Sequence, residues 1–251
     1  MQLRPSAVEA NANLGAVLQE RGDLAAARTA YQNALAVSPD LPGALWNLAI
    51  AAEREGDAEE AKRLLEKIVS TQPNWEDAAF RLGYWQLQGA DYGRAANSFE
   101  LCLKKRADWV EALVNLGLAQ WKLAEFDTAA HTFRHVLSLD PKNEDAMRSL
   151  AVILIDQKNL SEALELHRKL AAHGSPMPEL SYNLGLLLQS SGDYTAAVEC
   201  YRVAVERKPG FSHALLNLGH ALRASGKEDE AKQIWSQAVA ADPELASQYF
   251  L

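Results

Sequence analysis

The sequence predicts an all-α solenoid built from stacked antiparallel helix pairs, and three observations lead to this prediction. An Asn-Leu-Gly triplet or a variant of it recurs every 34 residues, seven times in all. The apolar residues around each triplet follow the spacing of an α-helix. A turn signal such as Gly-Asp and a later Pro then divide most 34-residue units into two helical stretches.

The repeat keeps its register over residues 8–245 without an insertion. The column that contains the Asn is Asn13, Asn47, Arg81, Asn115, Ser149, Asn183 and Asn217. Ala recurs in every unit, at Ala27, Ala61, Ala95, Ala129, Ala163, Ala197 and Ala231. A bulky residue follows each Ala by four positions, at Tyr31, Leu65, Phe99, Phe133, His167, Tyr201 and Trp235. The predicted units are therefore 8–41, 42–75, 76–109, 110–143, 144–177, 178–211 and 212–245.

Each unit is predicted to hold two helices because of where its helix-breaking residues stand. The first helix carries apolar residues at helical spacing, as at Leu215, Leu218 and Leu222. A Gly-Asp pair then ends it, because Gly tolerates left-handed backbone geometry and Asp caps the next helix. The second helix runs through the Ala column and stops near Pro. Since no single pair can bury its apolar faces alone, the pairs must stack.

Asn-Leu-Gly, then Ala with an aromatic residue four positions later, then Pro, at a period of 34 residues, resembles the tetratricopeptide repeat (TPR) family. The resemblance covers residues 8–245. It implies an α-α superhelix, right-handed, whose first helices line a concave groove. In this family the groove usually holds a peptide or protein segment.

Two units depart from the pattern. Unit three has Ala107 in place of the closing Pro. Unit five has Ala151 in place of Gly and Lys158-Asn159 in place of Gly-Asp, and it leaves through a segment that contains two prolines. We expect its second helix to end early and any bend or local mobility to lie at residues 173–178. An ordinary variant loop is the alternative.

The residues outside the seven units are predicted to belong to further units. Residues 1–7 resemble the tail of a preceding repeat, with Pro5 at its closing position. Residues 246–251 resemble the start of a capping helix or a further repeat, with Tyr249 in the family's aromatic column. We expect the chain to be a segment of a longer array, with a short natural C-terminal cap as the alternative.

Composition argues against several classes of function. The formal net charge of −8 argues against a nucleic-acid groove, which needs clustered Lys and Arg. No apolar run approaches the length of a membrane span, and the first residues do not resemble a signal peptide. We therefore expect no nucleic-acid partner, no membrane insertion and a cytoplasmic location.

No motif of catalysis is recognisable. The sequence has no glycine-rich phosphate loop, HExxH, CxxC or nucleophile elbow, so we predict no enzyme, no catalytic residue and no cofactor. His131 and His135 stand four apart on a predicted helix, but without a third ligand they predict no metal site. Cys102 and Cys200 lie three units apart, too far for a disulfide, and are expected to be small core residues.

The family's geometry implies which first-helix positions face the groove. These positions are too apolar for a face left in water, and such a stripe usually marks an interaction site. The predicted groove residues are Asn13, Trp46, Asn47, Ile50, Phe80, Arg81, Tyr84, Val114, Asn115, Leu118, Trp121, Tyr182, Asn183, Leu186, Asn217 and His220. The alternative is that Trp46, Tyr84 and Trp121 pack against neighbouring units as core.

The Asn column has two interpretations. Its amides can form a ladder that pairs with the backbone of a partner, because an amide offers both a donor and an acceptor. Alternatively, they form hydrogen bonds between units. Asn47 and Arg81 also match two places of the clamp with which some family members hold a terminal carboxylate. The other places are Ala12, Ala16 and Asp77, so we expect no such capture there.

Charged residues recur on the predicted groove helices. The second position of five units is acidic, at Glu9, Asp77, Glu111, Asp145 and Glu179. These acids complement the helix dipole, and a basic partner segment is the alternative. In unit seven, His213, Asn217, His220 and Arg223 are predicted to share one face, polar and cationic below neutral pH.

These features predict a module that binds a peptide or protein segment in its concave groove. One alternative is a self-assembling scaffold whose arrays stack through their ends or convex faces. Another is a substrate-recruiting arm of a larger enzyme, because the repeated groove Asn is similar to that of the arrays attached to protein O-glycosyltransferases of the O-GlcNAc and SPINDLY type.

Overall fold

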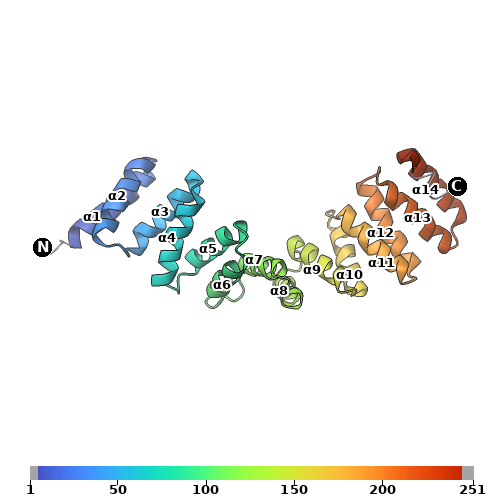
Figure 1. The fold of residues 1–251 in the computed structure, drawn as a ribbon, viewed down its shortest axis with the longest axis horizontal. Helices are drawn as coiled ribbons and strands as arrows, with labels where there is room; N and C mark the ends of the chain where they lie inside the picture. The colour runs from blue at the N-terminus through green and yellow to red at the C-terminus, as the bar shows by residue number, and fades with distance from the viewer. Residues whose placement is uncertain (1–4, 245–251) are drawn as a thin grey trace. The chain divides into compact units, whose positions relative to one another are not determined.

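The structure, a computed structural model, describes residues 5–244. This range folds into fourteen α-helices with no strand, which confirms the all-α prediction (Figure 1). The predicted tail of a preceding repeat covered residues 1–7; residues 1–4 lie outside the described range, and residues 5–7 form the start of α1, so Pro5 begins a helix there. The predicted further helix containing Tyr249 also lies outside the described residues.

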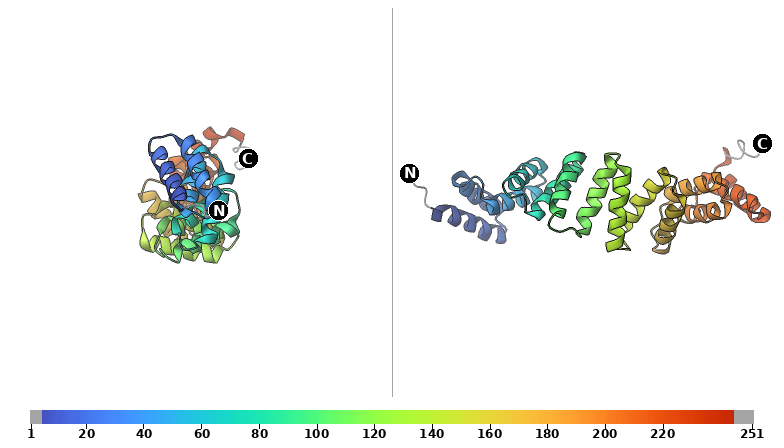
Figure 2. Two further views of the ribbon diagram at one scale, coloured as in Figure 1. Left: turned by 90° about the vertical axis from the view of Figure 1, so that its left-hand side faces the viewer. Right: turned by 90° about the horizontal axis from the view of Figure 1, so that it is seen from below.

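The chain divides into two compact units, Met1–Thr132 (the N-terminal unit) and Phe133–Leu251 (the C-terminal unit). The N-terminal unit contains α1 (Pro5–Glu20), α2 (Leu24–Val37), α3 (Pro42–Glu55), α4 (Ala58–Thr71), α5 (Glu76–Gln88), α6 (Tyr92–Leu103) and α7 (Val110–Lys122). The division falls inside α8 (Phe126–Leu139). The C-terminal unit contains α9 (Glu144–Asp156), α10 (Leu160–Ala172), α11 (Pro178–Ser190), α12 (Tyr194–Arg207), α13 (Ser212–Ala224) and α14 (Glu228–Ala241). Within each unit, consecutive helices pack in pairs, such as α1 with α2 and α11 with α12 (Figures 1 and 2).

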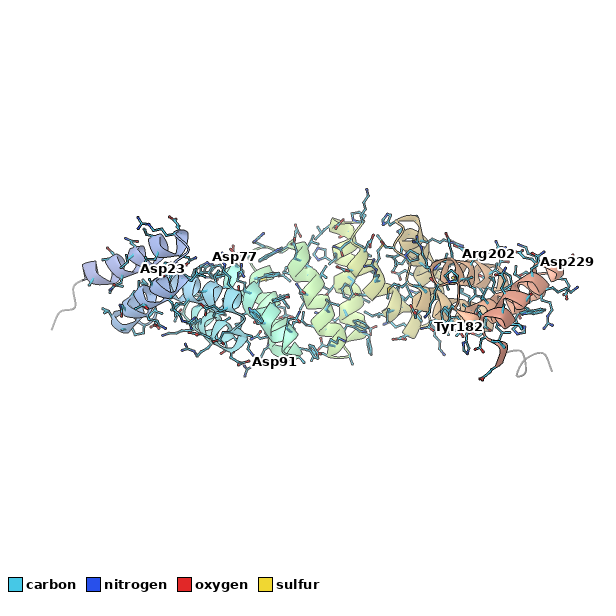
Figure 3. The ribbon with its side chains drawn as sticks, turned by 90° about the horizontal axis from the view of Figure 1, so that it is seen from above. Asp23, Asp77, Asp91, Tyr182, Arg202 and Asp229 are labelled. Carbon is cyan, nitrogen blue, oxygen red and sulfur yellow. The ribbon has the colours of Figure 1, made fainter. Side chains whose placement is uncertain are left out.

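Asp residues begin several second helices, as the turn signals predicted. Asp23 and Asp91, both labelled in Figure 3, precede α2 and α6. Their carboxylates accept hydrogen bonds from the backbone N–H groups of Ala26 and Arg94, at 3.1 and 3.4 Å. These bonds satisfy N–H groups that have no partner inside the helix.

Left-handed residues precede these caps. Gly22, Gly56, Gly192 and Gly226 have positive φ angles, as expected for residues that end a helix. Three other residues, Ala90, Ala124 and Lys158, take the same conformation with φ near +60°, although they carry a Cβ. The turn geometry is therefore retained even where the sequence does not supply Gly, at a cost in backbone strain.

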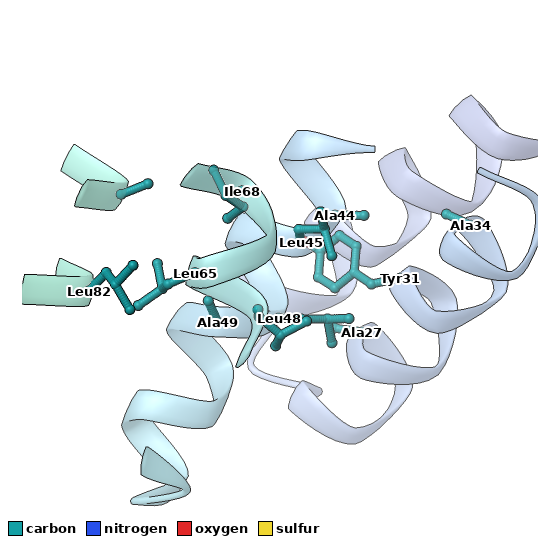
Figure 4. Packing of buried hydrophobic residues seen from close by; sticks show 12 residues of the cluster. Ala27, Tyr31, Ala34, Ala44, Leu45, Leu48, Ala49, Leu65, Ile68 and Leu82 are labelled. Carbon is teal, nitrogen blue, oxygen red and sulfur yellow. The ribbon is translucent and has the colours of Figure 1, made fainter. Parts of the chain in front are cut away.

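The Gly column is explained by the aromatic column that packs against it. A Cβ added to Gly15 would lie 2.5 Å from the ring of Tyr31, and one added to Gly185 would lie 2.6 Å from the ring of Tyr201. Both rings are buried, and Figure 4 shows Tyr31 within the core of the N-terminal unit. Unit five changes both partners, since Ala151 stands where five units have Gly and His167 replaces the aromatic ring; unit two likewise pairs Ala49 with Leu65.

The irregular junction at residues 173–178 lies within the C-terminal unit. There α10 ends at Ala172 and spans 13 residues, against 14 for α12, so the expected early end amounts to one residue. Gly174 follows with a φ of +78°, and α11 begins at Pro178. In unit three, α6 is shorter still, at 12 residues, although Ala107 replaces Pro. A terminal Pro is therefore not needed to end these helices.

Candidate functional site

The predicted groove residues lie on first helices and retain access to solvent. In the N-terminal unit they come from α1, α3, α5 and α7. Asn13 and Tyr84 are exposed there, and Tyr84 retains 43% of its surface. The half-buried ones are Trp46, Asn47, Ile50, Phe80, Arg81, Val114, Asn115, Leu118 and Trp121. In the C-terminal unit, Asn183 and Leu186 are exposed, and Tyr182, Asn217 and His220 are half-buried.

An aromatic residue 29 positions later stacks on several of these residues. Trp46 stacks on Trp75 with ring centroids 5.0 Å apart, and Phe80 stacks on Trp109 at 4.4 Å. In the C-terminal unit, the rings of Tyr182 and Phe211 lie 4.9 Å apart at a tilt. Sequence reasoning missed the second member of each pair, although the recurring spacing of 29 residues was the signal that could have found them.

Trp46 combines the two roles that the sequence left as alternatives. It packs against the buried core of the N-terminal unit, and it also lines an open pocket. Tyr84 does not share this dual role to the same extent, because it is more exposed and makes an edge contact with Trp85 at 6.0 Å. Of the predicted aromatic residues, Tyr84 is thus the one most accessible to another molecule.

An open pocket of about 570 Å³ lies among these residues of the N-terminal unit. Its aromatic walls come from α3, α5 and the residue that precedes α7: Trp46, Phe80, Tyr84, Trp85 and Trp109. Its charged residues are Glu53, Asp77 and Arg81. Four of the eight lining residues were predicted for the groove, and Glu53, Asp77, Trp85 and Trp109 were not.

Arg81 is held inside this pocket by two neighbours. Its guanidinium forms an ion pair with Glu53 and lies 5.4 Å from the centre of the Trp46 ring. Glu53 also accepts a hydrogen bond of 2.8 Å from the indole N–H of Trp85. Arg81, which stands in the Asn column, therefore binds a carboxylate of the chain itself. Its guanidinium is already paired, so of the two residues that match a carboxylate clamp, Asn47 and Arg81, only Asn47 is left.

Asp77, at the rim of the pocket, belongs to a second cluster of the same kind (Figure 3). Its carboxylate lies 3.5 Å from the guanidinium of Arg106, which in turn lies 3.9 Å from the centre of the Trp109 ring. The C-terminal unit repeats the arrangement, with Lys208 2.9 Å from Glu179 and 4.7 Å from the centre of the Phe211 ring. The hydrogen bond from Lys208 lowers the pKa of Glu179.

Three of the five first-turn acids, Asp77, Asp145 and Glu179, pair with cations of the chain. Asp77 and Glu179 pair with cations that lie 29 residues later, and Asp145 pairs with Arg148 at 3.3 Å. These acids complement the helix dipole and also bind cations of the chain. Within the part of the chain that the structure describes, Glu111 forms no ion pair.

The Asn side chains bond mainly to their own surroundings. Asn115 donates a hydrogen bond of 2.9 Å to the carbonyl oxygen of Glu111, one turn earlier. Asn217 donates to the carbonyl oxygen of His213 at 2.9 Å and to the hydroxyl of Tyr182 on α11 at 3.3 Å. The Asn217–Tyr182 bond joins two adjacent 34-residue repeats, which is the alternative expected for the Asn column. The amide oxygens of Asn115 and Asn217 lie on the groove helices as well.

His220 changes the expected charge of the α13 face. Its ring makes an edge contact with Trp235 at 5.2 Å, and Arg223 lies over the same indole at 5.1 Å. Burial, and secondarily the charge of Arg223, lowers the pKa of His220. This face therefore gains the charge of His220 at a lower pH than an exposed histidine would give.

The remaining candidates carry no recognisable chemistry. Cys102 and Cys200 are buried, and burial raises the pKa of their thiols to about 11 and about 12, which disfavours the reactive thiolate. Among residues 5–244 no group of three or more potential ligands could hold a metal ion. No helix in the same range is long and apolar enough to span a membrane.

Comparisons with known proteins agree with this architecture. Two tetratricopeptide repeat models match the chain, one over residues 18–82 and 188–250 and the other over residues 114–178. No curated protein matches it closely enough to count as a relative.

Several solved structures share the fold at low sequence identity. MamA protein is 23% identical with a TM-score of 0.58, and the match covers 70% of this chain and 96% of that one. YrrB, described as a TPR protein with an unusual peptide-binding site, is 17% identical with a TM-score of 0.58, covering 71% and 92%. PilF of Pseudomonas aeruginosa is 18% identical with a TM-score of 0.56, covering 83% and 95%.

Proposed function

The chain belongs to the tetratricopeptide repeat family, and from this premise we propose that it is a protein-interaction module. It holds an extended or helical segment of a partner protein against the first helices of its N-terminal unit. The fold that it shares with YrrB supports a peptide-binding site in that protein. No residue cluster described above has the geometry of a catalytic centre, so binding is the activity that its surfaces support best.

The aromatic pocket of the N-terminal unit is the observation that carries this proposal. It is open, it is lined by five aromatic side chains, and Tyr84 at its wall remains 43% exposed. Aromatic residues in such pockets dominate the affinity of protein interfaces, because they bury a large area at a small entropic cost. An exposed aromatic cluster is costly in water unless another molecule covers it.

Tyr84→Ala tests this proposal. A display library of random peptides is selected on the full chain, and the affinity of the recovered peptides is measured for each variant. Because Tyr84 keeps 43% of its surface exposed, its replacement should weaken binding by about tenfold or more while the helical circular dichroism stays unchanged. Tyr194→Ala, which changes a tyrosine of similar exposure (38%) at the start of α12, is the matched control and should bind as the wild type does. Unchanged affinity of every peptide for Tyr84→Ala would refute the proposal.

A second candidate function is self-association through the first helix. Leu14 and Val17 on α1 are 50% and 45% exposed, whereas the residues equivalent to Leu14 in the next two units, Leu48 and Leu82, are buried. This apolar face of α1 has the character of an inter-repeat contact that another helix covers. Sedimentation at several concentrations tests it, with Leu14→Gln as the comparison. A wild-type chain that stays monomeric throughout would contradict self-association.

A further inference from the structure

We propose that the aromatic pocket of the N-terminal unit is a subsite for a basic side chain, an Arg or Lys of the bound segment. The inference rests on the proposed function and adds the chemistry of the residue that anchors the partner. Its starting point is that the chain already places its own cations in this kind of environment, between an aromatic ring and a carboxylate.

Three such clusters recur in the molecule. Arg81 lies between Trp46 and Glu53, Arg106 between Trp109 and Asp77, and Lys208 between Phe211 and Glu179. A cation over an aromatic face is attracted by the electrons of the ring, and a nearby carboxylate adds a charged hydrogen bond. Two of the three clusters border the pocket, so its walls have the chemistry that binds a guanidinium or ammonium group.

The two clusters at the pocket differ in how readily a partner can replace the chain's own cation. Glu53 is only 13% exposed and bonds to both Arg81 and the Trp85 indole, so a cation of a partner cannot readily reach it. Asp77 and Arg106 are 56% and 49% exposed and 3.5 Å apart. Exposed pairs of this kind contribute little to stability, because water screens both charges. Asp77 is therefore the carboxylate that can change partners.

The charge around the open part of the pocket favours a cation over an anion. The charged side chains that line the pocket are two carboxylates, Glu53 and Asp77, and one cation, Arg81. An incoming carboxylate would meet Asp77, while the positive charge of Arg81 is already neutralised by Glu53. An incoming Arg or Lys would lay its alkyl stem along Tyr84 and Phe80 and bring its charge to Asp77.

The experiment uses the random-peptide display described above with one added step. Peptides that still bind the Tyr84→Ala variant are discarded. The peptides that remain depend on the pocket. We expect them to share an Arg or Lys at one aligned position. For one such peptide, blocked at both ends, replacement of that residue by Gln and the Asp77→Asn substitution should each weaken binding about fivefold or more. The two changes together should weaken binding by clearly less than the product of the single effects, because they remove one shared interaction.

Glu179→Gln is the matched control, since Glu179 occupies the same repeat position in the C-terminal unit and pairs with Lys208. It should leave the affinity unchanged. Pocket-dependent peptides that carry an acidic or a purely apolar residue at the aligned position would overturn this inference and leave the proposed function standing. Multiplicative effects of the two changes would overturn it in the same way. If no peptide depends on Tyr84, the proposed function fails and the inference fails with it.

Discussion

Trp46→Ala is predicted to lower the stability of the N-terminal unit as well as any binding. The substitution removes three interactions of the indole: the stack on Trp75, the contact with the Arg81 guanidinium, and the packing against the buried core. The aromatic stack contributes about 0.5–1.5 kcal/mol and the cation–π contact about 0.5–1 kcal/mol. A fully buried Trp→Ala change costs about 3–5 kcal/mol, and Trp46 is only half-buried, so roughly half of that applies.

These contributions overlap, and we expect a loss of about 3 kcal/mol in the free energy of unfolding. The measurement is urea denaturation followed by circular dichroism at 222 nm, with midpoints compared at equal slope because a repeat protein need not unfold in one step. Trp121→Ala is the control, since Trp121 is also half-buried on a first helix, but its one aromatic or cation–π contact among the described residues is with Lys122 at 5.3 Å. By the same half-burial it should cost about 2 kcal/mol. Equal midpoint shifts for the two variants would refute the reasoning.

Two further predictions concern the C-terminal unit. Gly185→Ala places a Cβ 2.6 Å from the buried Tyr201 ring, so it should lower the free energy of unfolding in urea by about 1–2 kcal/mol. Gly93→Ala, on a helix with open space around it, is the control and should be neutral or stabilising. Equal effects of the two substitutions would contradict the packing argument. His167 is buried with its Nε2 2.9 Å from the Ser181 hydroxyl, and burial lowers its pKa. The unfolded chain therefore binds a proton from about pH 6.5 downward before the folded chain does, so stability should fall as the pH drops below that value. Thermal denaturation from pH 7.5 to 5 checks this, and H167Q should lose less stability over that range; an identical pH profile for both proteins would exclude His167 as the cause.

The repeat could be derived from the sequence because its signals are local or strictly periodic. Gly22 and Asp23 form a turn that depends on a few neighbouring residues, and the structure shows the left-handed Gly and the Asp cap there. The pairing of Gly15 with Tyr31 follows from a fixed separation along the chain within one helix pair. The burial of both Cys residues likewise follows from their positions on second helices.

The candidate site was less accessible to sequence reasoning. Trp75 and Trp109 precede a first helix, outside the positions that the family's geometry assigns to the groove, yet they stack on Trp46 and Phe80. The partner of Arg81 was also hidden, because Glu53 lies on the preceding first helix, 28 residues earlier. The repeat columns align equivalent positions of different repeats, and equivalent positions do not show which side chains meet between neighbouring repeats.

The sequence by itself determined the all-α repeat fold, the helix-ending turns and the first-helix positions that carry the aromatic residues. These depend on contacts between residues at short, repeated separations, which periodicity records directly. Only the tertiary structure decided which of those aromatic side chains remain exposed, which carboxylates are already neutralised, and where a pocket opens. Those properties depend on the packing and ion pairing of long side chains that come from separate helices. The rotamers and partners of these side chains are determined only once the helices are packed.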